Sequence, residues 1–239
     1  MVRVAAAQVK VTEDIDANLQ RILKFIDDAK SKKVDIVCFP ECCLNTVAEN
    51  KADVSKQIEE IRAKCKERQI WCIFGSYVSE SGKTTNSVFL IDRSGRIKYK
   101  YDKVHLWISE KKNVVPGVSN NVIDTEFCKI GIIDCWDFAF PSYVQQLSKS
   151  GAKIIFCPNY LVDSEEDQEA MRTIPLVRAF ENIAFFVSCD AFAGDTLSES
   201  YICHPLKVMK SIVRKEGMII TDLNLEEVDS LRKYYDHLG

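Results

Sequence analysis

The sequence predicts a single α/β domain, residues 1–239, with strands in the interior and helices on the outside. Short apolar runs that suit buried strands recur along the chain, and segments with apolar residues at helical spacing lie between several of them. No stretch rich in Pro, Gly or Ser divides the sequence, and its 239 residues suit one large domain or two small ones. We therefore expect one continuous domain.

The composition is that of a globular protein with little net charge. Apolar residues make up 46% and charged residues 28%, and 32 basic against 35 acidic side chains give a formal charge of −3. Without a long basic run, this charge gives no reason to expect a nucleic-acid partner. Gln8 interrupts the short apolar stretch at the start, so we do not expect this stretch to be a secretory signal. Residues 183–194 are too few to span a bilayer and include Asp190. We expect a cytoplasmic protein without a membrane partner.

Ten cysteines raise the question of disulfides or a metal. In a chain of this length without a secretory signal, reduced thiols are the expectation. No C-x-x-C pair occurs, and the three histidines do not lie at ligand spacing from a pair of cysteines. Most cysteines stand in apolar runs and are expected to be small core residues.

Strands and helices alternate in the first part of the chain. Apolar residues recur at helical spacing from Ile15 to Ala29 and from Val54 to Cys65. Residues 34–41 form a short apolar run ending in Pro-Glu, which predicts a strand that stops at Glu41. The other strands predicted here are 2–9, 70–78 and a pair within 85–106 whose turn lies at Ser94-Gly95.

The second part continues with elements of the same kinds. Gly151 closes a predicted helix over residues 142–152, and a helix over about 166–182 contains Pro175. Residues 210–224 suggest a hairpin with its turn near Gly217, followed by a short helix from Leu225. The remaining predicted strands are 129–135, 153–159, 184–192 and 200–206.

Three of these apolar strands end in polar or reactive side chains, namely Glu41, Cys135 and Asn159. Lys103 follows the second strand of the first predicted hairpin. Sites in open α/β sheets lie beyond the carboxyl ends of the strands. If these strands are neighbours, Glu41, Lys103 and Cys135 can converge although they are distant in sequence.

Such a cluster would have a coherent chemistry. A thiol with a pKa of about 8.5 is mostly protonated at neutral pH, and a buried carboxylate can take its proton. A nearby lysine can stabilise an oxyanion, and the backbone N–H of Trp136, directly after Cys135, is a second candidate donor.

Each residue also has an ordinary reading. Cys135 alone is a core thiol, Glu41 a carboxylate at a helix start, and Lys103 a solvated lysine. Asn159 suits a pocket wall or a turn, and Trp136 suits a substrate pocket or the core. Further alternatives are a Cys/His hydrolase that uses His105 and a structural i, i+3 helix pair formed by Arg178 and Glu181.

An ordered set of motifs carries a family resemblance across nearly the whole chain. The motifs are "VAAAQV" near the start, "FPE" at 39–41, "YDKVHL" at 101–106, "VPG" at 115–117, "DCWD" at 134–137 and "VRAFENIAFFVSC" at 177–189. Together they resemble the nitrilase superfamily of carbon–nitrogen hydrolases, and an amidase-like member of it.

The resemblance implies a fold and roles for site residues. The fold is a four-layer α-β-β-α sandwich. Glu41 is implied as general base, Lys103 as the cation that stabilises the transition state, Cys135 as nucleophile and Glu110 as a second glutamate that orients Lys103 or the substrate. Trp136 and Asn159 are the candidate substrate-binding residues. No cofactor or metal is implied, and the expected assembly is a homodimer or a higher homo-oligomer.

Departures from the family pattern leave the substrate open among small amides, N-carbamoyl compounds and nitriles. Ala139 and Ser142 stand where many amidase-like relatives have Arg and Glu. An arginine there could bind a substrate carboxylate, so its absence argues against monoamides of dicarboxylic acids. Trp136 matches relatives that hydrolyse nitriles, whereas Asp137 does not. A catalytically inactive binding or scaffold protein is the alternative of another class.

Overall fold

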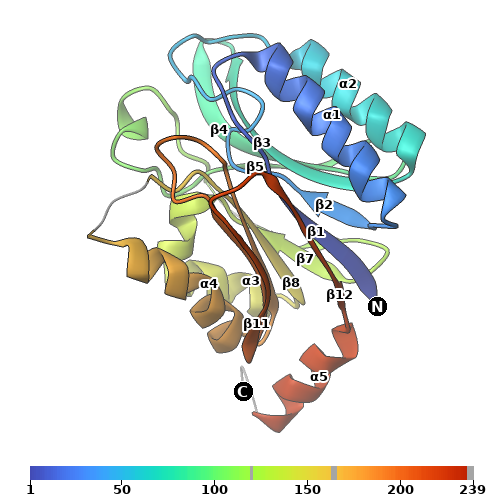
Figure 1. The fold of residues 1–239 in the computed structure, drawn as a ribbon. Helices are drawn as coiled ribbons and strands as arrows, with labels where there is room; N and C mark the ends of the chain where they lie inside the picture. The colour runs from blue at the N-terminus through green and yellow to red at the C-terminus, as the bar shows by residue number, and fades with distance from the viewer. Residues whose placement is uncertain (119–120, 163–165, 236–239) are drawn as a thin grey trace.

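The computed structural model describes residues 1–118, 121–162 and 166–235, and its strands form two mixed six-stranded sheets (Figure 1). The first sheet has the strand order β12 (Gly217–Leu223), β1 (Val2–Gln8), β2 (Ile36–Cys38), β3 (Trp71–Glu80), β4 (Lys83–Ile91) and β5 (Ile97–Asp102). The second has the order β11 (Lys207–Val213), β10 (Glu199–His204), β9 (Phe185–Asp190), β8 (Ile154–Asn159), β7 (Lys129–Ile132) and β6 (Ile123–Asp124).

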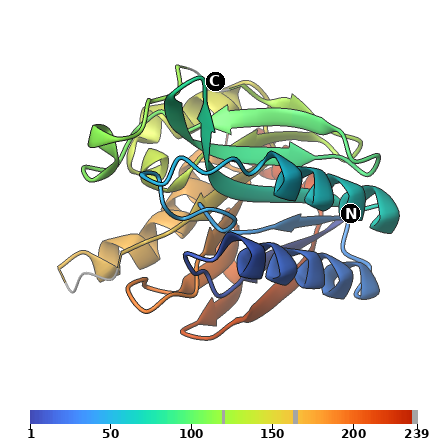
Figure 2. The same cartoon turned by 90° about the horizontal axis from the view of Figure 1, so that it is seen from above.

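Helices cover the outer face of each sheet, so the molecule has four layers (Figures 1 and 2). Helices α1 (Ile15–Ser31) and α2 (Ser55–Arg68) pack on the first sheet, and α3 (Pro141–Lys149) and α4 (Gln168–Asn182) pack on the second. A further helix, α5 (Leu225–Tyr234), follows β12. The predicted four-layer α-β-β-α sandwich is therefore confirmed.

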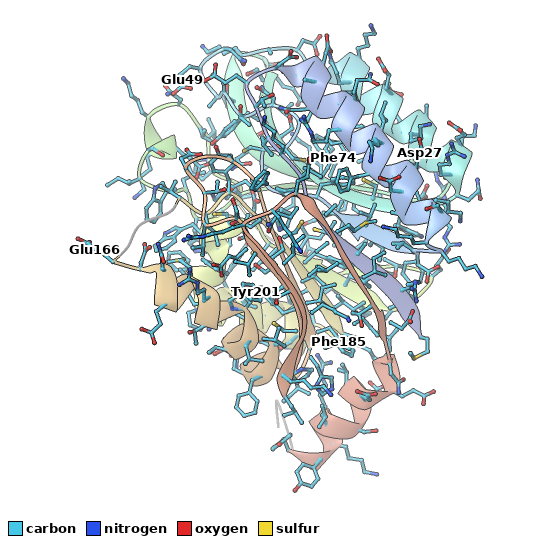
Figure 3. All side chains as sticks on the ribbon, viewed as in Figure 1. Asp27, Glu49, Phe74, Glu166, Phe185 and Tyr201 are labelled. Carbon is cyan, nitrogen blue, oxygen red and sulfur yellow. The ribbon has the colours of Figure 1, made fainter. Side chains whose placement is uncertain are left out.

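Three apolar cores hold the layers together. The first lies between α1, α2 and the first sheet and includes Phe74, and the second lies between the two sheets and includes Phe185 (Figure 3). The third lies between the second sheet and the helices α3 and α4. The central strands of both sheets therefore bury side chains on both faces, which explains why they appear in the sequence as continuous apolar runs.

Local sequence signals explain where the first helix begins and which face it buries. Asp14 is the N-cap of α1, and its side chain accepts a hydrogen bond of 3.0 Å from the N–H of Ala17. Leu19, Ile22 and Ile26 recur at helical spacing and are fully or almost fully buried against the sheet. The periodic pattern in the sequence therefore identifies the buried face of α1.

The predicted hairpin over residues 210–224 is wrong. Its two strands form as β11 and β12, but β11 pairs with β10 in the second sheet and β12 pairs with β1 in the first. The chain crosses from one sheet to the other at residues 214–216, where Arg214 has a positive φ of 50° and the Gln8 side chain donates to the carbonyl of Lys215. Two strands joined by a short turn gave a hairpin pattern, although their hydrogen-bond partners lie in different sheets.

The last strand, β12, pairs antiparallel with the first strand, β1, along its whole length. This pairing supports the prediction that residues 1–239 form one domain, which stays a prediction. Among the residues described, no helix has both the length and the apolar character needed to cross a bilayer. All ten cysteines have free thiols.

Candidate active site

Five of the six predicted site residues line one cavity of about 570 Å³, namely Glu41, Lys103, Glu110, Cys135 and Trp136. Glu41 follows β2 and Lys103 follows β5, both in the first sheet, whereas Cys135 follows β7 in the second. The strand ends therefore meet across the interface between the two sheets, and the three strands are not all neighbours within one sheet.

Lys103 lies between the two glutamates and is only 1% exposed. Its Nζ donates to Glu41 Oε1 at 2.6 Å and to Glu110 Oε2 at 2.7 Å. Burial acts to lower the pKa of Lys103, but the charges of Glu41 and its other neighbours outweigh it and raise that pKa well above its usual value. The ammonium group is therefore a fixed positive charge in the cavity wall.

The pKa values of the two glutamates are shifted in opposite directions, although Lys103 acts to lower both. For Glu41, burial outweighs the attraction of Lys103, and its pKa is raised. For Glu110, burial is also the largest effect, but Lys103 and the hydrogen bonds from Asn86 and the Trp107 N–H together lower its pKa. Of the two carboxylates, Glu41 is thus the stronger proton acceptor.

Cys135 is the first residue of the short 3-10 helix η2 (Cys135–Ala139) and has a φ of +43°. A non-glycine residue in this region is strained and is held there by its surroundings. Burial, followed by the charge of Glu41, raises the pKa of the Cys135 thiol well above its usual value. The interaction of this thiol with Glu41 is in turn one of the effects that lower the pKa of Glu41. The resting sulfur is therefore a protonated thiol next to a carboxylate.

Asn86 is a site residue that the sequence reasoning missed. It lies on β4, is 1% exposed, and its Nδ2 donates to Oε1 of both Glu41 and Glu110 at 2.7 Å. Its backbone carbonyl accepts from the N–H of Lys103 at 2.9 Å. Asn86 thus fixes both carboxylates and the lysine backbone. A single asparagine within a strand carries no signal in the sequence that would indicate this role.

Asp137 is a second residue that was not assigned a role. Its Oδ1 accepts from the backbone N–H of His105 at 2.8 Å, and its Oδ2 accepts from the Tyr101 hydroxyl at 2.6 Å and from the Asp134 N–H at 3.0 Å. These bonds join the segment that carries Cys135 to the segment that carries Lys103. The Asp137 side chain is fully buried, and its hydrogen bonds connect the two sheets.

Two glycines let the site segments approach each other. A Cβ on Gly75 of β3 would lie 2.5 Å from the backbone nitrogen of Cys42 and 2.7 Å from Cα of Glu41. A Cβ on Gly117, the last residue of the Val-Pro-Gly motif, would lie 2.0 Å from the carbonyl oxygen of Asp102. Only glycine fits at these two close contacts between backbone segments.

The candidate substrate-binding residues differ in position. Trp136 is half-buried and lines the cavity, where its ring meets that of Trp107 edge to face at 4.5 Å between centroids. Asn159 is fully buried, and its Nδ2 donates to the Cys157 carbonyl and to the Ser188 hydroxyl. Asn159 is not part of the cavity lining, so its predicted role in substrate binding gains no support from these contacts and stays a prediction.

The other residues weighed from the sequence have structural contacts. The His105 ring stacks on Phe140 at 3.7 Å, and its Nδ1 lies 2.7 Å from Asp137 Oδ1. His105 is not part of the cavity lining. Arg178 donates to Glu181 at 2.7 Å, which is the predicted helix pair, and also to the carbonyl of Phe138 at 2.6 Å.

Comparisons with known proteins agree with this geometry. The profile of the carbon-nitrogen hydrolase family matches residues 3–233. The chain is 26% identical to "Omega-amidase NIT2" of Xenopus tropicalis over 254 residues, which cover 97% of this chain and 91% of that protein. It is also 26% identical to "Nitrilase homolog 2" of Dictyostelium discoideum over 172 residues, which cover 64% of this chain and about half, 52%, of that protein.

Solved structures show the same fold. The crystal structure of Saccharomyces cerevisiae Nit3, described as a member of the nitrilase superfamily, superposes with a TM-score of 0.90 at 21% identity and covers all of this chain and 95% of that one. A carbon-nitrogen hydrolase from Helicobacter pylori gives a TM-score of 0.90 at 19% identity, covering 99% of this chain and 94% of that one.

Proposed function

Because the chain belongs to the carbon-nitrogen hydrolase family and hydrolyses C–N bonds other than peptide bonds, we propose that it cleaves a linear amide or N-carbamoyl group through a thioester on Cys135. The observation that carries this proposal is the contact of one buried lysine with two carboxylates at the wall of the cavity that the Cys135 thiol also lines.

In the first step of the proposed mechanism, Glu41 removes the proton of the Cys135 thiol as the sulfur attacks the carbonyl carbon. The raised pKa values of both groups support this step, because a protonated thiol needs a base and a more basic carboxylate is a better one. Glu41 then delivers the proton to the leaving nitrogen, and ammonia or an amine departs. A thioester between the acyl group and Cys135 remains.

The developing oxyanion would be stabilised by two donors. Lys103 supplies a fixed positive charge, and the Trp136 N–H lies in the first turn of η2, where N–H groups have no partner within the helix. Glu110 would hold Lys103 in place, since it accepts from Nζ at 2.7 Å. In the second half of the reaction, Glu41 activates water, which hydrolyses the thioester.

The test is a screen for ammonia release from simple amides, N-carbamoyl compounds and nitriles, combined with mass spectrometry of the intact protein. We expect an acyl adduct on Cys135 that disappears in Cys135→Ala. Cys42 provides a matched control, since it is a buried thiol that lines the same cavity, and Cys42→Ala should keep the adduct. Full turnover by Cys135→Ala would end the proposal, and turnover of nitriles alone would favour the nitrilase alternative.

A homo-oligomer and a cytoplasmic location remain predictions. An exposed apolar surface supports the first. On α4, Val177 is 40% and Phe180 51% exposed, and the Phe180 ring contacts that of Tyr235, which is 46% exposed. Large apolar side chains grouped on one face often mark a contact between protein chains. The molar mass in solution, measured by light scattering, tests this prediction.

A further inference from the structure

The cavity around Cys135 has an excess of acidic side chains. Besides Glu41 and Glu110, which Lys103 partly neutralises, three more carboxylates belong to its lining, those of Glu13, Asp167 and Asp195. Lys103 is the single basic residue among the described residues of this lining. Since the Glu41–Lys103–Glu110 group itself carries a formal charge of −1 when all three are ionised, the cavity has no positive charge available for an anionic substrate.

Nothing in the described part of the chain neutralises the three outer carboxylates. None of them forms an ion pair with a lysine or arginine there. Oδ1 of Asp167 is shielded from solvent and has no hydrogen-bond partner among the described residues. Although Asp167 is the N-cap of α4, its side chain makes no capping bond. A shielded carboxylate oxygen without a partner is costly unless a donor reaches it.

Asp195 is connected to the proposed catalytic residue Glu41 through Tyr160. The Tyr160 hydroxyl donates to Asp195 Oδ1 at 2.8 Å, while the backbone N–H of the same tyrosine donates to Glu41 Oε2 at 2.9 Å. Tyr160 therefore fixes Asp195 at a set position relative to Glu41. A carboxylate held in this way can orient a charged group of the substrate as well as attract it.

Aromatic rings complete the surroundings that suit a cation. The rings of Trp107, Trp136 and Tyr160 all line the cavity. Ammonium and guanidinium groups are attracted to the faces of such rings, and the attraction is strongest for tryptophan. Carboxylate and aromatic groups together favour a positive charge over a neutral or negative one.

We propose that this cavity selects amides or monosubstituted ureas that carry an ammonium or guanidinium group remote from the scissile bond. Asp167, Asp195 and Glu13 bind that positive group while the carbonyl lies at Cys135. The proposal deepens the proposed function and rests on it for the position of the reacting carbonyl.

The experiment compares 5-aminopentanamide, hexanamide and adipamic acid, which are similar in length but carry a positive, no and a negative charge at pH 7.5. We expect kcat/KM to be at least tenfold higher for the cation than for the neutral amide, and lowest for the anion. In Asp167→Asn/Asp195→Asn, the ratio of cation to neutral amide should fall at least tenfold, since each charge contributes about fivefold at contact distance in water. Asp229→Asn, which removes an exposed carboxylate on α5 outside the cavity lining, should leave the ratio unchanged.

Binding to Cys135→Ala, measured by calorimetry, separates this proposal from the proposed function because it requires no turnover. Tighter binding of 5-aminopentanamide than of hexanamide, weakened by Asp167→Asn/Asp195→Asn and by added salt, supports the cation site even if no amide is hydrolysed. Equal binding of the two amides, or a preference for adipamic acid, overturns it even if the thioester mechanism holds.

Discussion

Lys103→Met should lower the free energy of unfolding relative to the wild type, and the size of this loss should depend on pH. The substitution keeps an unbranched side chain but removes the charge that contacts Glu41 at 2.6 Å and Glu110 at 2.7 Å. The two glutamates are 4% and 7% exposed, so they would face each other in a buried site without a cation. Breaking a buried ion pair by removing one partner costs about 3–5 kcal/mol, so we expect a loss of about 4 kcal/mol at pH 7.5.

Lower pH should recover most of this loss. Without Lys103, burial and mutual repulsion raise the pKa of at least one glutamate in the folded variant above its unfolded value of about 4.3. The folded variant then binds a proton that the unfolded chain does not, and its stability increases as pH falls towards that unfolded value. One proton over 2.5 pH units corresponds to about 3.4 kcal/mol, which leaves a difference from the wild type of about 1 kcal/mol at pH 5.

Urea unfolding followed by circular dichroism at pH 7.5 and pH 5 measures both differences. Lys100→Met is the matched control, since Lys100 lies on β5 and its ion pairs with Asp102 and Glu80, at 3.4 and 4.0 Å, are partly exposed. Such pairs contribute at most about 1 kcal/mol. A Lys103→Met loss of the same size at both pH values would refute the reasoning, because it would mean that neither glutamate takes up a proton.

Three further predictions concern buried polar groups near the cavity. Asn86→Leu removes two hydrogen bonds to the charged Glu41 and Glu110, each worth about 1.5–3 kcal/mol. The free energy of unfolding, measured with urea at pH 7, should therefore fall by about 3–6 kcal/mol. A decrease below about 1 kcal/mol would contradict the role of Asn86. Asp134 is fully buried, and neither of its carboxyl oxygens has a hydrogen-bond partner among the residues that the structure describes. Burial, then the charge of Glu41, raises its pKa well above its usual value. Wild-type stability should therefore fall as pH rises above the unfolded pKa of about 3.9, and Asp134→Leu should raise the urea midpoint more at pH 8 than at pH 5; a lower midpoint at pH 8 would contradict this. Burial raises the pKa of Asp190 to about 7, so the wild type should lose about 4 kcal/mol of stability between pH 4 and pH 7 as this group ionises. In Asp190→Asn, the melting temperature should therefore change less with pH in that range. An unchanged dependence of the melting temperature on pH would contradict this prediction.

The sequence indicated most strands and helices because their apolar patterns reflect burial directly. Residues 2–9 lie between the two apolar cores on either side of the first sheet, and the periodic residues of α1 face one of them. The pairing of strands is harder to predict from the sequence, because hydrogen bonds between strands join residues that are distant in sequence. The supposed hairpin at 210–224 shows this limit: its strands were predicted, but their distribution between two sheets was not.

The same distinction applies to the site. Glu41, Lys103 and Cys135 were predicted because each follows an apolar strand and belongs to an ordered set of motifs, and all three line the cavity. Asn86 was missed because its side chain acts only through residues brought near by folding. Asn159 was proposed because it also ends a strand, but a position at a strand end does not determine where the side chain points. Its amide donates inward to Cys157 and Ser188.

The residues of the site come from two different sheets, so the position of the thiol relative to the carboxylate depends on how the sheets pack. Glu41 and Lys103 belong to the first sheet and are joined directly by a hydrogen bond of 2.6 Å, whereas Cys135 belongs to the second. The bonds of Asp137 to Tyr101 and to the His105 N–H connect the two parts close to the cavity. Because the Glu41–Lys103 bond joins residues of the first sheet alone, we expect it to persist in variants whose altered packing between the sheets shifts the thiol. Substitutions in the core between the sheets should accordingly slow the proposed attack by Cys135 more than they disturb the Glu41–Lys103 pair.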